Sequence, residues 1–173
     1  MSEKTMNNAP EPIRNDSLSA AMKAVRENPG TESTVVMLNE IVNARLLIPI
    51  TLDREPEIDK ETGNAILEKD TQIDFELIRN KEGQIFYPVF TDGEEMRKCA
   101  TDKDQKSLIA TFDDLVALLA QDGNKVSGFV VNPMGDNLVF PIPLIEAMIS
   151  DMMKHRHGED AVDNIEDDKE TEE

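Results

Sequence analysis

The segment ARLLIPITL, residues 44–52, constrains the fold more than any other stretch of this chain. Almost every residue in it is apolar, which is expected for a β-strand that is covered on both faces. Pro49 lies inside the segment and cannot donate a hydrogen bond to a neighbouring strand. The segment is therefore predicted to be a buried strand, with an edge position or a bulge at Pro49.

A hairpin is predicted in the next apolar region. Residues 71–80 alternate apolar and polar side chains, which indicates a half-buried antiparallel strand. The loop at 80–83 ends in a glycine and leads to a return strand at 84–90. Pro88 restricts the pairing of this return strand on one side.

A second hairpin is predicted over residues 127–140. Asn132, Pro133 and Gly135 occupy the first, second and fourth positions of a type I turn, where these residue types are favoured. Helices are predicted from Asp16 or Ser17 to about 27, from Thr31 or Ser33 onward, after residue 91, over 111–121, and from Pro143 onward.

This order of elements predicts an α+β (mixed α/β) fold. We expect a single small domain, with a mostly antiparallel mixed sheet flanked by helices, over residues 16–153. Residues 1–15 carry two prolines among polar residues and are expected to be a flexible lead-in. Residues 154–173 are expected to form a disordered acidic tail, because they have few apolar side chains to bury.

The charge of the chain limits its partners. Acidic residues outnumber basic ones 36 to 18, for a net charge of −18. Nucleic-acid binding needs clusters of lysine and arginine against the phosphates, and anionic membranes repel the same excess of acids. We therefore expect no nucleic-acid partner and no membrane contact. The acidic tail is either a solubilising segment or an arm that engages a basic partner.

The N-terminal segment has no apolar stretch typical of a signal peptide, and the single cysteine cannot form an intramolecular disulfide. These features predict a cytoplasmic, reduced and soluble protein.

The chain resembles the SseB-type domain, which is named for enhanced serine sensitivity. The matching features are the ARLLIPITL strand, the IFYPVFTDGEEM junction, the TFDDLVALLA helix, the GFVVNP strand and the closing LVFPIPLIEAM segment. The resemblance spans roughly residues 17–150. It implies a small mixed α/β domain, often cytoplasmic in bacteria, with no established reaction.

The junction Thr91-Asp92-Gly93-Glu94-Glu95 has two interpretations. In the structural one, Thr91 and Glu94 form a capping box at the start of a short helix. In the functional one, the carboxylates of Asp92, Glu94 and Glu95 bind Mg²⁺ or Ca²⁺. The spacing does not fit a calcium-binding loop, so the capping interpretation is favoured.

The junction and the turn at 132–137 each follow a strand. If those strands are neighbours, the two loops form one polar rim, and grooves beyond strand ends are common binding sites. The candidate binding surface then comprises Thr91, Asp92, Glu95, Asn132, Pro133 and Asp136.

Catalytic chemistry has little support in the sequence. Both histidines, His155 and His157, lie beyond the expected domain, so its core offers no imidazole base to a serine or cysteine. Cys99 has basic neighbours that could lower its pKa, although an incidental thiol is the simpler interpretation. We expect no catalytic residue, no metal site and no cofactor.

The first hypothesis is therefore a non-enzymatic protein-interaction or regulatory module with an unidentified protein partner. The alternative is a small-molecule- or divalent-metal-dependent enzyme that uses the acidic loop at 91–95. A third option is a structural protein that buffers charge.

Overall fold

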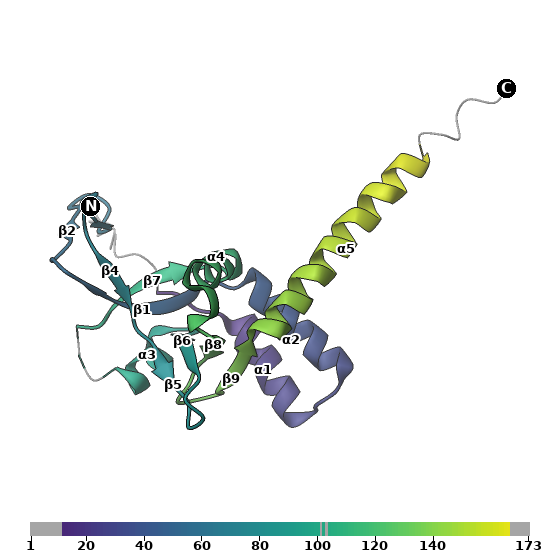
Figure 1. Cartoon of the computed structure of the whole chain (residues 1–173), viewed down its shortest axis with the longest axis horizontal. Helices are drawn as coiled ribbons and strands as arrows, with labels where there is room; N and C mark the ends of the chain where they lie inside the picture. The colour runs from purple at the N-terminus through teal and green to yellow at the C-terminus, as the bar shows by residue number, and fades with distance from the viewer. Residues whose placement is uncertain (1–11, 101, 103, 167–173) are drawn as a thin grey trace, which may run out of the picture.

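The computed structural model describes residues 12–100, 102 and 104–166 of the chain (Figure 1). Its helices are α1 (Asp16–Glu27), α2 (Thr31–Asn43), α3 (Gly93–Cys99), α4 (Phe112–Asp122) and α5 (Ile142–Glu166), with a 3-10 turn, η1, at Gly123–Lys125. Its strands are β1 (Leu46–Leu52), β2 (Glu57–Ile58), β3 (Ala65–Ile66), β4 (Ile73–Phe75), β5 (Ile78–Arg79), β6 (Ile85–Val89), β7 (Lys106–Ala110), β8 (Gly128–Val131) and β9 (Leu138–Pro141).

The strands form two main sheets, as expected for a mixed α+β domain. One has the order β4-β1-β7 and is antiparallel throughout. The other has the order β5-β6-β8-β9, and only its β6–β8 pair is parallel. Leu47 and Phe90 join the two sheets, because each backbone N–H donates to the other carbonyl at 2.8 Å. The small β2–β3 hairpin stands away from both sheets (Figure 1).

The prediction of an edge position at Pro49 is wrong, because β1 is the central strand of its sheet. Leu47 uses its backbone groups to pair with Phe90, and alternate residues of a strand direct these groups to the same side. The nitrogen of Pro49 therefore points to the side on which the partner of β1 changes from Phe90 to β4. Pro49 has no N–H to donate, and this missing donor lies between the position paired with Phe90 and the positions paired with β4.

Residues 71–80 form two short strands, not the single strand expected. β4 pairs with β1, whereas β5 pairs with β6 in the other sheet. Between them, the backbone N–H of Glu76 donates to the carbonyl of Pro49 at 3.1 Å, and Leu77 is 49% exposed. The chain crosses from one sheet to the other at this point, which breaks the alternation that the sequence suggests.

The hydrophobic core lies on one face of the four-stranded sheet. Tyr87, Phe129 and Phe140 occupy the same register position on adjacent strands and are nearly fully buried. Phe129 stacks on Phe140 with ring centroids 4.9 Å apart, and Phe112 from α4 meets Phe129 in an edge-to-face arrangement. Helices α1, α2 and α5 also contribute buried side chains to this cluster. Each buried large side chain contributes about 1.5–3 kcal/mol to stability, so this aromatic layer helps fix how the helices lie on the sheet.

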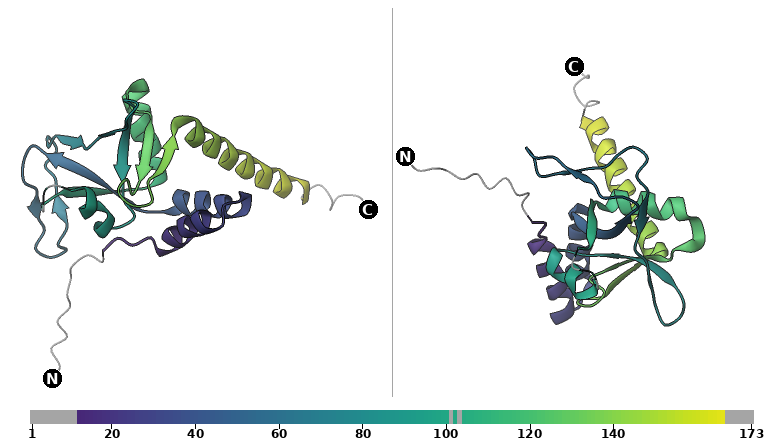
Figure 2. Two further views of the ribbon diagram at one scale, coloured as in Figure 1. Left: turned by 90° about the horizontal axis from the view of Figure 1, so that it is seen from below. Right: turned by 90° about the vertical axis from the view of Figure 1, so that its left-hand side faces the viewer.

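The end of α5 differs from the expected domain boundary. The helix continues past residue 153 to Glu166 and leads away from the sheets (Figure 2), where the sequence predicts a disordered tail from 154. Buried Ile145 and Met148 anchor its first turns. Once these turns have formed, each residue added to the helix gains one backbone hydrogen bond. The polar residues after 153 can therefore continue α5. Residues 1–11 of the expected lead-in and 167–173 of the expected tail lie outside the described residues.

The first two helices begin at Asp16 and Thr31, two of the residues expected to cap them, so their N-caps lie one residue earlier. Their N-cap residues are Asn15, whose side chain makes no capping hydrogen bond, and Gly30, which has no side chain. Asn15 instead uses its side chain in a contact with the sheets that is described below.

Candidate functional site

Two loops meet at one edge of the four-stranded sheet. β6 and β8 are parallel neighbours, so both end at the same edge. The junction at 91–95 follows β6, and the turn at 132–137 follows β8. The sequence raised the possibility that these loops adjoin, and in the structure they are joined by hydrogen bonds. The geometric condition for a shared rim is met.

The centre of this edge is a buried polar pair. Thr91 and Asn132 are each only 1% exposed. The backbone N–H of Thr91 donates to Oδ1 of Asn132 at 3.1 Å, and Nδ2 of Asn132 donates to Oγ1 of Thr91 at 3.1 Å. Buried polar groups are costly unless they are paired, and these two residues satisfy each other. Both are therefore inaccessible to a ligand at the surface.

The cap of α3 is Asp92, so the expected capping box of Thr91 and Glu94 is wrong. Oδ1 of Asp92 accepts a hydrogen bond from the Glu95 N–H at 2.9 Å, and Oδ2 accepts from the Thr91 hydroxyl at 3.0 Å. The side chain of Thr91 is turned toward Asn132 and cannot reach the first turn of the helix. The next residue caps instead, and Glu94 is left exposed at the surface.

Glu95 lies across the turn that follows β8. One of its carboxylate oxygens pairs with Nζ of Lys98 at 2.5 Å. The other, Oε2, is buried and has no hydrogen-bond partner among the described residues. A Cβ atom added at Gly135 would lie 2.4 Å from this oxygen, so the absence of a side chain at Gly135 makes room for the carboxylate.

Asp136 and Asn15 attach α1 to this edge. The carboxylate of Asp136 accepts from Nη1 of Arg26 at 2.7 Å and from Nδ2 of Asn132 at 3.0 Å. At the other end of α1, Nδ2 of Asn15 donates to the Thr91 carbonyl at 2.7 Å. We call these residues the polar hub: Asn15, Arg26, Thr91, Asn132 and Asp136. Their geometry is that of a structural junction between a helix and two loops.

Pro133, the remaining candidate, faces a different feature. It lines a groove of about 1020 Å³ on the second face of the four-stranded sheet, opposite the core. The side chains of Pro88, Val130 and Val139 share that face, because they are paired across β6, β8 and β9. α3 covers only part of this face, where Met96 and Cys99 enclose a cavity of about 90 Å³ with Pro88.

The groove combines exposed apolar side chains with basic ones. Met134 is 68% exposed and Val139 is 44% exposed. Arg79 and Lys98 are the charged residues among its described lining, and no described acidic residue lines it. Lys98 is held by Glu95, and the hydrogen bond that its ammonium donates to that carboxylate raises the lysine pKa. Arg79 forms no ion pair with any residue that the structure describes.

The comparison with protein families decides what kind of domain this is. The family model of the SseB protein N-terminal domain matches residues 18–147. The chain belongs to the SseB family. Comparison with curated proteins and with solved structures gives no significant match. The groove and most of the polar hub lie within the matched residues of this SseB domain, and only Asn15 of the hub precedes them.

The thiol of Cys99 behaves differently from the expectation based on its basic neighbours. Burial raises the pKa of Cys99, and this effect exceeds the lowering by the charge of Lys98. A thiol with a raised pKa holds less thiolate at neutral pH and is a poorer nucleophile. In this SseB domain, Cys99 contributes to the walls of the groove and the small cavity.

The described part of the SseB domain contains no group of three histidine, cysteine or acidic side chains placed to hold a metal ion. The imidazole of His155 is exposed and lies 3.7 Å from Asp151 on the same helix. Among the described helices, none has the length and apolar character that crossing a membrane requires.

Sequence reasoning missed the groove. β8 is apolar at every position, which indicates a strand covered on both faces. Among the predicted helices, the short α3 is the one left to pack on that second face. The apolar character of β8 therefore pointed to a second covered face, but locating the groove also required the order of the strands in the sheet.

Proposed function

We propose that this SseB domain is a non-enzymatic protein-interaction module and that the groove is its recognition surface. The observation that carries the proposal is the second face of the four-stranded sheet, which is apolar but only partly covered. In a two-layer domain, each apolar sheet face packs against another element. Here the helix on that face is the seven-residue α3, and the cover is uneven: Phe86 and Val130 are buried, whereas Val139 is left 44% exposed.

The size and lining of the groove favour a protein partner. Small-molecule sites have volumes of about 300–1,000 Å³ and enclose most of the ligand. The groove, at about 1020 Å³, lies just above that range and extends over β5, β6, β8 and β9. Met134 belongs to its lining and is exposed, and flexible methionine side chains adapt to varied partner surfaces.

The enzymatic alternative has weaker support. It needs the carboxylates of the 91–95 loop to be free for a metal or substrate. Both oxygens of Asp92 are engaged at the start of α3, and Glu95 is packed over Gly135. Only Glu94 presents an unengaged carboxylate at the surface of that loop. A single exposed carboxylate is a poor basis for catalysis.

The proposal includes a cytoplasmic location. A single half-buried cysteine is compatible with a reducing compartment, where disulfides are rare. The net charge further narrows the class of partner, since a chain with a net charge of −18 is poorly suited to binding phosphate backbones.

The test compares two valine-to-arginine substitutions at positions of similar exposure. Val139→Arg places a charge inside the groove, whereas Val35→Arg places one on α2, away from it; the two valines are 44% and 49% exposed. Tagged wild-type protein and both variants are used to capture partners from the source cells, and each captured partner is then purified and titrated calorimetrically.

We expect a partner that binds wild type and Val35→Arg with equal affinity and loses at least tenfold in affinity for Val139→Arg. Circular dichroism checks that all three proteins melt alike. Retention of every partner by Val139→Arg would show that the groove is not the recognition surface.

A further inference from the structure

We infer that the groove binds a protein segment in which a carboxylate side chain lies beside apolar ones. This inference rests on the proposed function and specifies the chemistry of the partner. It is carried by the contrast between the groove and the rest of the chain. Acidic residues dominate the chain overall, whereas the described lining of the groove holds two basic residues and no acidic one.

Arg79 is the main determinant of charge recognition. It lies at the end of β5, is exposed, and has no ion-pair partner among the described residues. The neighbouring polar groups Asn80 and Gln84 bond to each other at 2.8 Å. The guanidinium is therefore available, and its planar set of donors matches a carboxylate in a bidentate pair.

Lys98 supports the same preference from α3. Its ammonium group donates one hydrogen bond to Glu95, but its side chain remains half exposed and two of the three N–H donors are left. The acidic residues near it, Glu95, Asp92 and Asp136, raise its pKa and keep it charged. Cys99 is the only other titratable group in the described lining, and burial keeps it a neutral thiol.

The overall negative charge does not override this local preference. At physiological ionic strength, charges more than about 8 Å apart are largely screened. An incoming carboxylate at contact distance from Arg79 responds mainly to that guanidinium. The distant acids instead disfavour long acidic partners, so a short segment with one or two carboxylates fits best.

The apolar part of the ligand would lie on the sheet face. Val139 and Met134 are exposed, and Pro141 and Ile142 continue the lining from β9 into α5. Burying an apolar side chain there removes apolar surface from water, which favours the complex. Neither the cations nor the apolar surface alone would give both affinity and selectivity.

The test selects ligands from a phage-displayed library of random 12-residue peptides. Selection is run on the folded full chain, with wild type and Val139→Arg as parallel targets. Peptides retained only by wild type are sequenced, synthesised and titrated. We expect them to carry aspartate or glutamate next to apolar residues.

Two arginine substitutions then test the charge. Arg79→Gln removes the groove guanidinium, and we expect it to weaken the selected peptides at least fivefold. Arg97→Gln is the matched control, because Arg97 is an exposed arginine of α3 that does not line the groove and has no ion pair with a described residue. It should bind the same peptides with unchanged affinity.

The outcomes separate the two proposals. If no peptide distinguishes wild type from Val139→Arg, the groove is not a binding site and both proposals fail. If such peptides are found but are basic or uncharged, or bind Arg79→Gln as tightly as wild type, the proposed function stands and this inference is overturned.

Discussion

Thr91 and Asn132 are 41 positions apart in the sequence, yet each donates a hydrogen bond to the other at 3.1 Å. The pair is buried and lies where β6 and β8 end. It holds the α3 junction against the turn that follows β8. Asn132 also has a left-handed backbone, with φ of 49°, which asparagine tolerates better than most residues.

Replacing Asn132 should reveal the strength of this pair. Asn132→Ala leaves the buried Thr91 N–H without a partner and strains the left-handed backbone. We expect it to lower the free energy of unfolding by about 2–4 kcal/mol, measured by urea denaturation. Asn132→Gly removes the strain but not the loss of hydrogen bonds, and should cost about 1–3 kcal/mol.

Asn137 provides the matched control, because it is also left-handed, with φ of 51°, but is exposed. Asn137→Ala should cost only the backbone term of about 1–2 kcal/mol. Equal losses for Asn132→Ala and Asn137→Ala would show that the buried hydrogen bonds contribute no net stability.

Two glycines should respond differently to alanine. At Gly128, φ is +148° and a Cβ atom would lie 2.0 Å from the backbone oxygen of Phe140, which cannot move without disrupting β9. We expect Gly128→Ala to cost about 3 kcal/mol or more. At Gly135 the clash is with the flexible end of Glu95, so Gly135→Ala should cost about 1 kcal/mol or less.

The stability of both glycine variants is measured by thermal and urea unfolding. The Glu95→Ala background provides a further check, because removing the carboxylate should make Gly135→Ala nearly neutral while Gly128→Ala stays costly. A large Gly135→Ala effect in that background would contradict the proposed role of Gly135.

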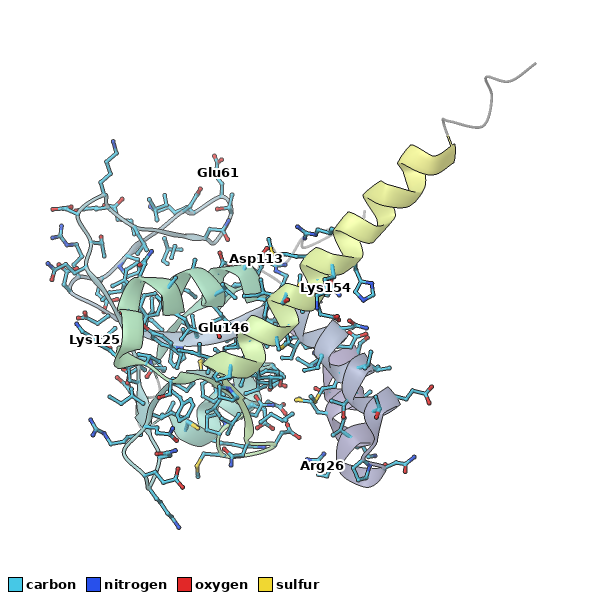
Figure 3. The ribbon with its side chains drawn as sticks, turned by 45° about the vertical axis from the view of Figure 1, so that its right-hand side comes forward. Arg26, Glu61, Asp113, Lys125, Glu146 and Lys154 are labelled. Atoms are coloured by element: carbon cyan, nitrogen blue, oxygen red, sulfur yellow. The ribbon has the colours of Figure 1, made fainter. Side chains whose placement is uncertain are left out.

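Arg26 and Asp136 connect α1 to the turn after β8, and Figure 3 shows Arg26 on α1. The carboxylate of Asp136 is only 19% exposed, which limits screening by solvent. We expect a double-mutant cycle of Arg26→Ala and Asp136→Ala to give a coupling of about 0.5–1 kcal/mol. The exposed Lys23–Glu27 pair is the control, and its coupling should be at most about 0.5 kcal/mol. Equal couplings would argue against a special role for the hub pair.

The cap of α4 should make stability depend on pH. Hydrogen bonds from the backbone and hydroxyl of Thr111 lower the pKa of Asp114. Its stabilisation is therefore present above the unfolded-state pKa of about 3.9 and is lost as pH falls through the lower folded value. Asp114→Ala should destabilise by about 1 kcal/mol at pH 7, and the difference from wild type should shrink below pH 4.

Asp113→Ala is the control for this pH effect. Asp113 lies in the same first turn of α4, at the surface (Figure 3), but does not close the capping box. Its substitution removes only an interaction with the helix dipole, worth about 0.3–1 kcal/mol. Urea titrations from pH 3 to 7 compare the variants, and a constant Asp114→Ala deficit across that range would contradict the cap assignment.

Structures closed by local hydrogen bonds could be predicted from the sequence. In the 80–83 loop, the Gly83 N–H donates to the Asn80 carbonyl at 3.1 Å, and Gly83 has the positive φ that was expected. In the later turn, the Gly135 N–H donates to the Asn132 carbonyl at 2.9 Å. The helix from Thr111 likewise begins at its own cap. In each case the partners lie within a few residues, so residue type and spacing alone determined the conformation.

Tertiary contacts decided what the sequence left open. Asn132 turns Thr91 inward, so Asp92 becomes the cap of α3. Residues 71–80 are shared between two sheets, because β4 pairs with β1 and β5 pairs with β6. The groove exists because β6, β8 and β9 lie side by side while the short α3 leaves Val139 of β9 exposed on their second face. The sequence by itself determined the fold class and the local turns; these other features depend on residues that are distant in sequence, and only folding brings them together.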